Sequence, residues 1–402
     1  MRLKHGSILI LVTLSWLLII FACTKLQAAV TWTPSDGLYQ QQKTISGKIV
    51  TRYVKLTNEQ VKALIATPAE IPPKSRQIPA EIPPIAVVDL NDGAHMNMPY
   101  VKKTNIPVGA MSKNYIDLIP AQYPPSIHTD PADANNGEFR VSCNFSHMLQ
   151  DDPIVKPGQK GASHWHTFFG NSQTDANSTI ASLMSSGSSS CDGGIMNRSA
   201  YWIPSMVDTR TGTLIAPSGG NFYYKTESAN SVVSVPVGLK MVAGNMTSTS
   251  TQDHIHWWCA DSIDNNVVGD QGYIPTCAPG DHLLAVINFP NFWDGVNLDS
   301  ADHKSHVSYI HDSAHPVQIP DITFNIRYDV GANDDTSQWR LSSDMYDTTK
   351  KGGYSLHGDY MFGWSTDPKT SKNFSEIFWT GCLKSAVNCG NSLLGDGRQF
   401  QY

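Results

Sequence analysis

From about residue 138 to the end, the sequence consists of short apolar or alternating runs between turn-forming residues, and this pattern constrains the fold most. The runs are about 4–8 residues long and rich in Val, Ile, Tyr and Phe, as in β-strands. Examples are 139–143, 221–225, 232–237, 283–289, 306–310 and 322–328. Helical periodicity is sparse, and the best candidate helix starts behind Asp175 and ends near Ser185. We predict a mainly β domain over residues 136–402, a disulfide-braced sandwich or distorted barrel with long loops and few short helices.

The composition excludes several classes of protein. Charged residues make up only 16% of the chain, which argues against coiled coils, helical repeats and charged disordered tails. The formal net charge is −6, so the chain lacks the basic excess that phosphate-backbone binding requires. We therefore expect no nucleic-acid partner.

The N-terminus predicts export. Two basic residues, Arg2 and Lys4, precede an apolar run over residues 8–22, which is shorter than the about 20 residues of a spanning helix. We predict a signal peptide over residues 1–28, secretion, and no transmembrane span in the mature chain. The alternative is a lipoprotein box at residues 20–23, in which Cys23 is lipidated. Either interpretation places the mature protein outside the cytoplasm.

The cysteines fit an exported protein. Of seven cysteines, the six that follow Cys23 predict three disulfides. Proximity along the chain favours the pairs Cys259–Cys277, Cys382–Cys389 and Cys143–Cys191. A cysteine in a disulfide cannot act as a thiolate nucleophile or a zinc ligand, so the chemistry must come from other side chains.

Residues 29–135 differ in texture from the rest. Thr57 and Gln60 form a capping box at the start of a short predicted helix that ends before Pro68. The sequence Ala-Glu-Ile-Pro-Pro then occurs at 69–73 and again at 80–84, which favours an extended polyproline conformation. This part of the chain is predicted to be an N-terminal Pro-rich extension with one short helix.

The histidines are the most informative candidates for chemistry. Residues i and i+2 of a strand share a face, so His164 and His166 would point the same way, as would His357 and Asp359. Imidazoles on one face with nearby carboxylates commonly hold Zn²⁺, Cu²⁺, Mn²⁺ or Fe²⁺. A single His-x-His also arises by chance among 14 histidines, and a His/Asp site without metal can do acid–base work. The familiar zinc-hydrolase and nucleophile-elbow motifs are not present in the sequence.

The candidates fall into three groups, with a divalent metal ion as the expected cofactor. The metal ligands would be His147, His164, His166, His303, His357 and Asp359. The catalytic groups would be His164, His166, His306, Asp302 and Asp152. The substrate contacts would be Asn171, Arg198, Trp202, Trp293 and Asp294, because aromatic faces stack on sugar rings while amides and charged groups bind hydroxyls.

Several polar motifs of the β domain also match a known family, in order along the chain. They lie at residues 151–158, 163–171 (Ser-His-Trp-His-Thr-Phe-Phe-Gly-Asn), 197–202, 292–295, 298–306, 353–359 and 394–398. On these motifs, residues 138–400 resemble the secreted family numbered 1996 among the domains of unknown function. Some fungal members occur alongside carbohydrate-binding modules, so the resemblance implies polysaccharide or cell-wall work but no particular reaction.

Two functions of different classes follow. The first is an exported carbohydrate-active enzyme, a hydrolase in which the His/Asp cluster holds a divalent metal or acts as general acid and base on polysaccharide. The second is a noncatalytic protein that binds a glycan or the cell envelope. An enzyme needs converging titratable groups with perturbed pKa values, whereas a binding protein needs an exposed aromatic platform.

Overall fold

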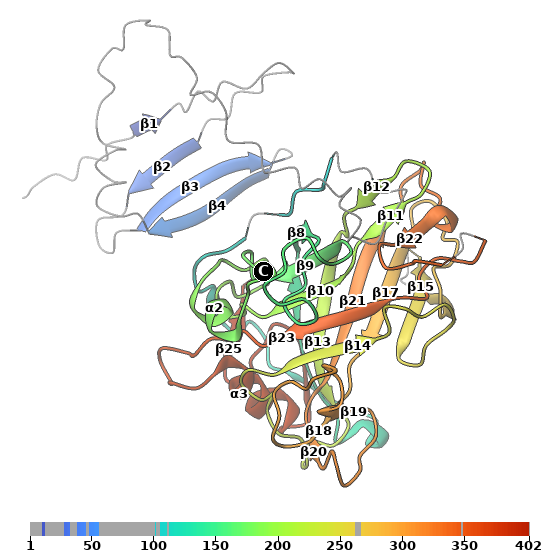
Figure 1. Cartoon of the computed structure of the whole chain (residues 1–402). Coiled ribbons are helices and arrows are strands. Elements are labelled where there is room, and N and C mark those ends of the chain that lie inside the picture. Colours follow the sequence, from blue (N-terminus) through green and yellow to red (C-terminus); the bar gives the residue numbers. More distant parts are fainter. Residues whose placement is uncertain are drawn as a thin grey trace, which may run out of the picture. The chain divides into compact units, whose positions relative to one another are not determined.

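The computed structural model describes residues 10–12, 28–32, 38–45, 48–55, 101, 105–110, 112–261, 267–346 and 349–401 (Figure 1). The chain divides into two compact units, residues 1–86 and 87–402. The first unit contains an antiparallel sheet with the order β1 (Ile10–Val12), β2 (Ala28–Trp32), β3 (Leu38–Ile45) and β4 (Lys48–Lys55). The predicted helix behind Thr57, the Pro-rich repeats and Cys23 lie outside the described residues. β1 falls within the predicted signal peptide, whose cleavage stays a prediction.

The second unit is mainly β, as predicted, and its largest sheet has eight strands. Their order is β16 (Val267–Gln271), β15 (Ile255–Ala260), β17 (His282–Asn288), β21 (Asp321–Asp329), β13 (Gly219–Thr226), β7 (Gly137–Cys143), β24 (Val387–Asn391) and β6 (Ser126–Ile127). Neighbouring strands are antiparallel except β7 and β24, which are parallel.

A five-stranded antiparallel sheet lies against the first one. Its order is β14 (Lys240–Gly244), β23 (His357–Met361), β10 (Ala200–Pro204), β9 (His166–Gly170) and β8 (Phe145–Leu149). Smaller sheets combine β12 (Thr213–Ile215), β11 (Met206–Asp208) and β22 (Trp339–Leu341); β19 (Val307–Ser308), β18 (Phe292–Trp293) and β20 (Val317–Gln318); and β25 (Arg398–Phe400) with β5 (Leu118–Pro120). The helical elements are η1 (Pro131–Asp133), α2 (Ile180–Ser185), η2 (Thr336–Gln338), α3 (Phe374–Phe378) and η3 (Trp379–Leu383).

The two large sheets share one core. Alternate side chains of a strand point to opposite faces, and in β21 Phe324 and its apolar neighbours at i±2 are fully buried. Tyr201 of the five-stranded sheet reaches across to this face. Its ring centroid lies 4.1 Å from that of Phe222 and 5.5 Å from that of Phe324. The aromatic contacts thus join the inner faces of both sheets.

The outer faces of the two sheets differ, and this difference positions the site. On the five-stranded sheet the outer face is also apolar, and Phe168 and Trp202 pack there in a second cluster with Ile154 and Leu183. Strands β9, β10 and β23 are consequently buried at every residue. On the eight-stranded sheet the residues that alternate with the core are mostly polar.

Several expectations from the sequence are confirmed. The structure contains the disulfides Cys143–Cys191, Cys259–Cys277 and Cys382–Cys389. These three bonds suggest an oxidising, extracytoplasmic environment. Strands cover the runs at 139–143, 221–225, 283–288 and 322–328. Among the described residues, no helix is long and apolar enough to cross a membrane.

Three local predictions are wrong. Residues 232–237 form no strand, because Pro236 lacks an N–H and the segment follows the core as an irregular chain. Only Val307–Ser308 of the run at 306–310 is a strand. The helix begins at Ile180 and not directly behind Asp175, since Thr179 is the residue whose side chain caps it. Apart from these three, strands β5 and β6 lie within residues 29–135, the predicted N-terminal extension, and pair with strands of the second unit.

Asp192 predicts a pH dependence of stability. Its carboxylate accepts a hydrogen bond from the Ser392 hydroxyl, and burial raises its pKa from an ordinary 3.8 to about 6. The unfolded chain therefore loses this proton at lower pH than the folded protein, so stability falls as pH rises from about 4 through 6. Asp192→Asn removes the effect. We expect the variant to be more stable at pH 8 by up to about 3 kcal/mol and equal to wild type at pH 3.5.

Urea unfolding of both proteins at pH 3.5, 5 and 8 measures this difference. Parallel profiles of unfolding free energy against pH would contradict the assignment.

Candidate metal centre

The candidate site lies at one end of the apolar outer face of the five-stranded sheet. In the antiparallel register, Trp202 of β10 is opposite Phe168 of β9 and opposite Asp359 of β23, so the three side chains share a face. His166 and His357 lie two residues from Phe168 and Asp359 and point the same way. The strand period therefore brings two histidines and one aspartate together on the outer face of the sheet.

Three imidazole rings converge there. The ring centroid of His164, just before β9, is 4.2 Å from that of His166 and 5.0 Å from that of His357. The His166 and His357 centroids are 5.8 Å apart. One nitrogen from each ring lies within 4.8 Å of the others, and one atom each of Asp152, His166 and Asp359 meets the same limit. The five side chains form what we call the His/Asp cluster.

Hydrogen bonds to carbonyl groups fix the tautomers of two of these histidines. His166 Nδ1 is 2.9 Å from the Asp151 carbonyl oxygen, and His357 Nδ1 is 2.9 Å from that of Ser355. A carbonyl only accepts, so Nδ1 must carry the proton in both rings. Each neutral ring then presents the lone pair of Nε2 to the cluster. Metal-binding histidines are oriented by second bonds of this kind.

The cluster contains several buried polar atoms without a hydrogen-bond partner. They are both nitrogens of His164, Nε2 of His166 and both carboxylate oxygens of Asp359. His357 Nε2 is 3.9 Å from the nearer Asp359 oxygen, which is longer than a hydrogen bond. Each such buried atom costs about 1–3 kcal/mol, so their concentration in one place calls for a shared partner.

Burial determines the charge state of the cluster. It lowers the pKa of His166 to about 4 and that of His357 to about 3, and it lowers the pKa of His164 well below its usual range. Burial also raises the pKa of Asp152 and, with Asp152 as a further cause, that of Asp359. At neutral pH the imidazoles are uncharged, which is the form that binds metal ions.

A loop over residues 299–306 borders the His/Asp cluster. Burial is the largest influence on the pKa of Asp359 and raises it, whereas the nearby Lys304 ammonium lowers it. His303 likewise lowers the pKa of Asp152, although its contribution is one of the smaller ones and burial dominates. The His303 Nδ1 atom itself lies 2.8 Å from an Asp299 carboxylate oxygen. His303 is therefore beside the cluster and already paired.

His147 lies elsewhere on β8. Its Nδ1 is 2.9 Å from the Ser146 hydroxyl oxygen, and its Nε2 donates to the Thr174 carbonyl at 2.7 Å. The ring stacks on Phe168 with a centroid distance of 4.9 Å. Both nitrogens already have partners, so the structure does not bring His147 into the cluster.

His306 and Asp302 organise the bordering loop. His306 Nε2 donates to the Lys240 carbonyl at 2.8 Å, and its Nδ1 lies 2.9 Å from the Ser300 hydroxyl. Asp302 accepts from the Ser305 amide at 2.9 Å and from the Ser305 hydroxyl at 2.8 Å, and these bonds lower its pKa. Their predicted catalytic roles stay predictions, because neither side chain belongs to the cluster.

Two predicted substrate contacts hold the chain near α2. Asn171 Nδ2 donates to the carbonyls of Leu183 at 3.1 Å and Ser186 at 2.8 Å. Arg198 Nε donates to the Gly187 carbonyl at 2.8 Å. These bonds to backbone carbonyls give Asn171 and Arg198 a structural role near α2. Their contact with substrate stays a prediction.

The other three predicted contacts are spread over two places. Trp202 is fully buried beside Asp359, and its Nε1 has no hydrogen-bond partner. Trp293 Nε1 donates to the Asn297 carbonyl at 2.6 Å, and Asp294 accepts from Asn297 Nδ2 at 2.7 Å within the same turn. The structure thus separates Trp202 from the turn formed by the other two.

The sequence prediction assigned no role to three residues that support the site. Lys304 and Ser355 lie inside the motifs at 298–306 and 353–359, between predicted site residues. That position in the sequence is the signal that could have identified them. Asp344 lies outside every such motif. Its Oδ2 accepts from the Leu341 and Gly353 amides at 2.9 and 2.7 Å, and its Oδ1 accepts from the Ser355 hydroxyl at 2.6 Å. Asp344 thereby fixes the segment that leads into His357.

We predict that Asp344→Ala weakens both the fold and the site. The variant leaves the amides of Leu341 and Gly353 buried without acceptors, so the free energy of unfolding should fall by about 3 kcal/mol or more. Metal affinity should fall about 10–100-fold, as for other outer-shell residues. Asp344→Asn keeps one acceptor oxygen and is the milder, matched variant. Urea unfolding and competition with a chelator measure the effects. Wild-type values for Asp344→Ala in both assays would contradict this role.

Comparison with known proteins gives one match. The family model described as "Domain of unknown function (DUF1996)" matches residues 152–364. No curated protein and no solved structure matches the chain. The matched region begins at Asp152 and includes all five residues of the His/Asp cluster. It is shorter at both ends than the resemblance over residues 138–400.

Proposed function

We propose that this chain, which belongs to the DUF1996 family, is an extracytoplasmic metalloprotein that binds one divalent transition-metal ion in its His/Asp cluster and hydrolyses polysaccharide. The observation that carries the proposal is that buried nitrogen and oxygen atoms, several of them unpartnered, converge in two groups of three residues that share His166. A cation would give one nitrogen of His164, Nε2 of His166 and the Asp359 carboxylate a partner at once. Uncharged imidazoles beside carboxylates suit a divalent ion better than a second protein group.

The donor set narrows the choice of metal. Three imidazoles with carboxylate oxygens suit Zn²⁺, Mn²⁺, Fe²⁺ or Cu²⁺. Thiolate ligands are unsupported because the cysteines of the second unit are paired in disulfides. Three histidine ligands resemble a catalytic zinc site, which keeps a further position for water.

The chain's own residues would supply the remaining chemistry. A metal ion held by His164, His166 and His357 would supply Lewis-acid chemistry, which can activate a water molecule as a nucleophile at neutral pH. Asp152 and Asp359 lie beside the imidazoles, where a carboxylate can accept and return a proton. Such a site supports attack on a glycosidic or ester bond of a polysaccharide.

A specific observation favours a second function. The five cluster side chains are at most 4% exposed, and a closed metal site of this kind usually stabilises a fold. The protein would then be a noncatalytic binder of glycan or cell envelope with a structural ion. Metal content alone does not separate these two functions, but activity of the loaded protein does.

We predict that His164→Ala/His166→Ala removes the metal ion. Purified wild-type protein should contain about one equivalent of a divalent transition metal by elemental analysis, and the variant almost none, because two of three imidazole ligands are lost. His254→Ala/His256→Ala is the matched control, since it deletes the same His-x-His spacing where His254 stacks on Tyr309 and His256 pairs with Asp270. This control should keep its metal.

Near-UV circular dichroism establishes whether each variant is folded. Metal-free wild-type protein, or equal metal loss in both double variants, would contradict the proposed centre.

Asp152→Asn tests the hydrolytic step. The amide keeps an oxygen for the Ile154 and Val155 amides, each 2.9 Å from Asp152 Oδ1, so the turn should persist. Removing a general base lowers kcat by about 10²–10⁴-fold. Release of reducing ends from soluble polysaccharides by metal-loaded protein measures this rate, with metal content as the parallel readout. Metal-loaded wild-type protein that cleaves no polysaccharide would favour the structural ion.

A further inference from the structure

The polar outer face of the eight-stranded sheet forms a second candidate site. In the antiparallel register Ser142, Asn221 and Asn325 occupy neighbouring positions on β7, β13 and β21. Arg140 and Tyr223 form the next row of the same face. This face points away from the shared core, so its polar side chains have no packing role there.

A hollow follows these rows. A cavity of about 770 Å³ is lined by Tyr223, Asn325 and Arg327, among others. A second cavity of about 370 Å³ is lined by Tyr223 and Asn325 as well and continues to Trp258 on β15. The shared residues make the two cavities one depression, which we call the sheet groove. It crosses the strands from β7 to β15, about 19 Å at an interstrand spacing of about 4.8 Å.

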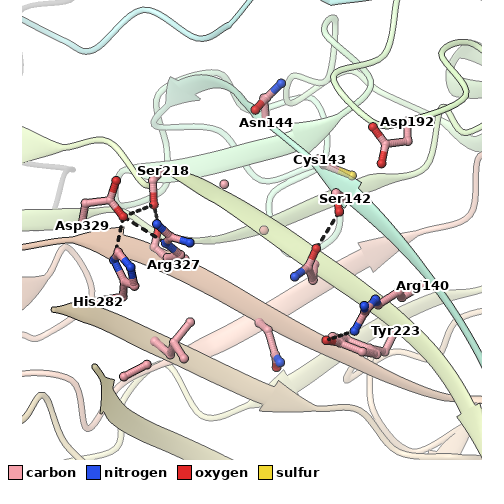
Figure 2. Close-up of a pocket in the computed structure, with 16 residues that line it drawn as sticks. Arg140, Ser142, Cys143, Asn144, Asp192, Ser218, Tyr223, His282, Arg327 and Asp329 are labelled. Carbon is pink, nitrogen blue, oxygen red and sulfur yellow. Dashed lines mark hydrogen bonds and ion pairs between the residues drawn. The ribbon is translucent and has the colours of Figure 1, made fainter. Parts of the chain in front are cut away.

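The groove's side chains are held in place by one another. Figure 2 shows Asp329 at one end between Ser218, Arg327 and His282, with distances of 2.9, 3.0 and 3.0 Å. At the other end, Arg140 donates to the Tyr223 hydroxyl at 3.1 Å.

In the middle of the groove, Ser142 donates to Asn221 Oδ1 at 2.7 Å. A ligand would therefore meet a preorganised surface, which reduces the entropy lost on binding.

Two buried polar atoms in the groove have no hydrogen-bond partner. They are Asn325 Oδ1 and Trp258 Nε1. The first accepts and the second donates, so a ligand that carries hydroxyl groups satisfies both. Tyr223 and Trp258 lie three strand positions and four residues along the strands apart, at about 20 Å, and each side chain is partly exposed in the groove.

We propose that the sheet groove binds an uncharged linear polysaccharide. Amides and hydroxyls match sugar hydroxyl groups, and the faces of Tyr223 and Trp258 provide stacking platforms at two points along the chain. The charges argue against a polyanion, because the acids that line the groove outnumber the Lys and Arg side chains: Glu138, Asp192, Asp270 and Asp329 against Arg140, Lys225 and Arg327. A strand-crossing groove with separated aromatic platforms also fits an extended polymer better than a small molecule.

The sheet groove and the His/Asp cluster lie on outer faces of different sheets, with the shared core between them. The groove therefore acts as a separate polymer-binding surface, and it does not depend on a metal ion. Its test can fail while the metal proposal stands, and the reverse holds too.

Affinity electrophoresis of the full chain tests this inference. Native gels would contain laminarin, hydroxyethylcellulose or glucomannan, with polygalacturonate as the anionic comparison. Wild-type protein should be retarded by at least one uncharged polymer, and Tyr223→Ala/Trp258→Ala should raise the apparent Kd at least about tenfold, or about 1.4 kcal/mol. The matched control is Tyr115→Ala/Tyr123→Ala, which removes two tyrosines that are 53% and 52% exposed outside the groove. It should bind as wild type does.

Tyr223→Ala/Trp258→Ala should keep the metal content of wild type, which separates the groove from the metal centre. Three results would overturn the inference: no retardation by any uncharged polymer, retardation by polygalacturonate alone, or equal binding by the groove variant and wild type. Circular dichroism of the groove variant shows whether it is folded, so that a folding defect is not mistaken for a loss of binding.

Discussion

Buried nitrogen and oxygen atoms need partners, and the His/Asp cluster concentrates this requirement in one place. The outer face of the five-stranded sheet is apolar around Phe168 and Trp202, so water cannot satisfy the neighbouring groups freely. Carbonyl acceptors orient His166 and His357 but leave their Nε2 atoms directed at the cluster. A bound cation would give these atoms a partner, and uncharged imidazole is the form that binds metal ions. The proposed metalloprotein function follows from this single constraint.

The outer faces of the two large sheets provide different environments for the two proposed sites. One outer face is covered and dry, which makes electrostatic interactions strong and holds the cluster residues rigidly. The other is open and polar, with its side chains already paired among themselves. A metal centre requires the first environment and a polymer-binding surface the second. We regard the shared core as the element that keeps the two proposed activities independent.

Much of the fold could be predicted from the sequence because β-strand periodicity is local. The alternation in 322–328 identifies β21, and the i, i+2 spacing puts His357 and Asp359 on one face. Which strands become neighbours is not local. The sequence does not show that β9 and β23 flank β10, so it gives no reason to prefer His357 over His306 as a site residue. Nor could it reveal the sheet groove, whose residues come from separate strands and carry no motif.

The most direct test of the proposed centre is anomalous diffraction from crystals of the full chain, purified without chelators and measured on both sides of the absorption edges of zinc, copper, iron and manganese. We predict one strong anomalous peak, about 2.0–2.2 Å from a nitrogen of each of His164, His166 and His357. A carboxylate oxygen of Asp359 or Asp152 should lie beside the ion. The metal centre would be contradicted by crystals in which the three imidazole rings lie as described and no anomalous peak is found beside them.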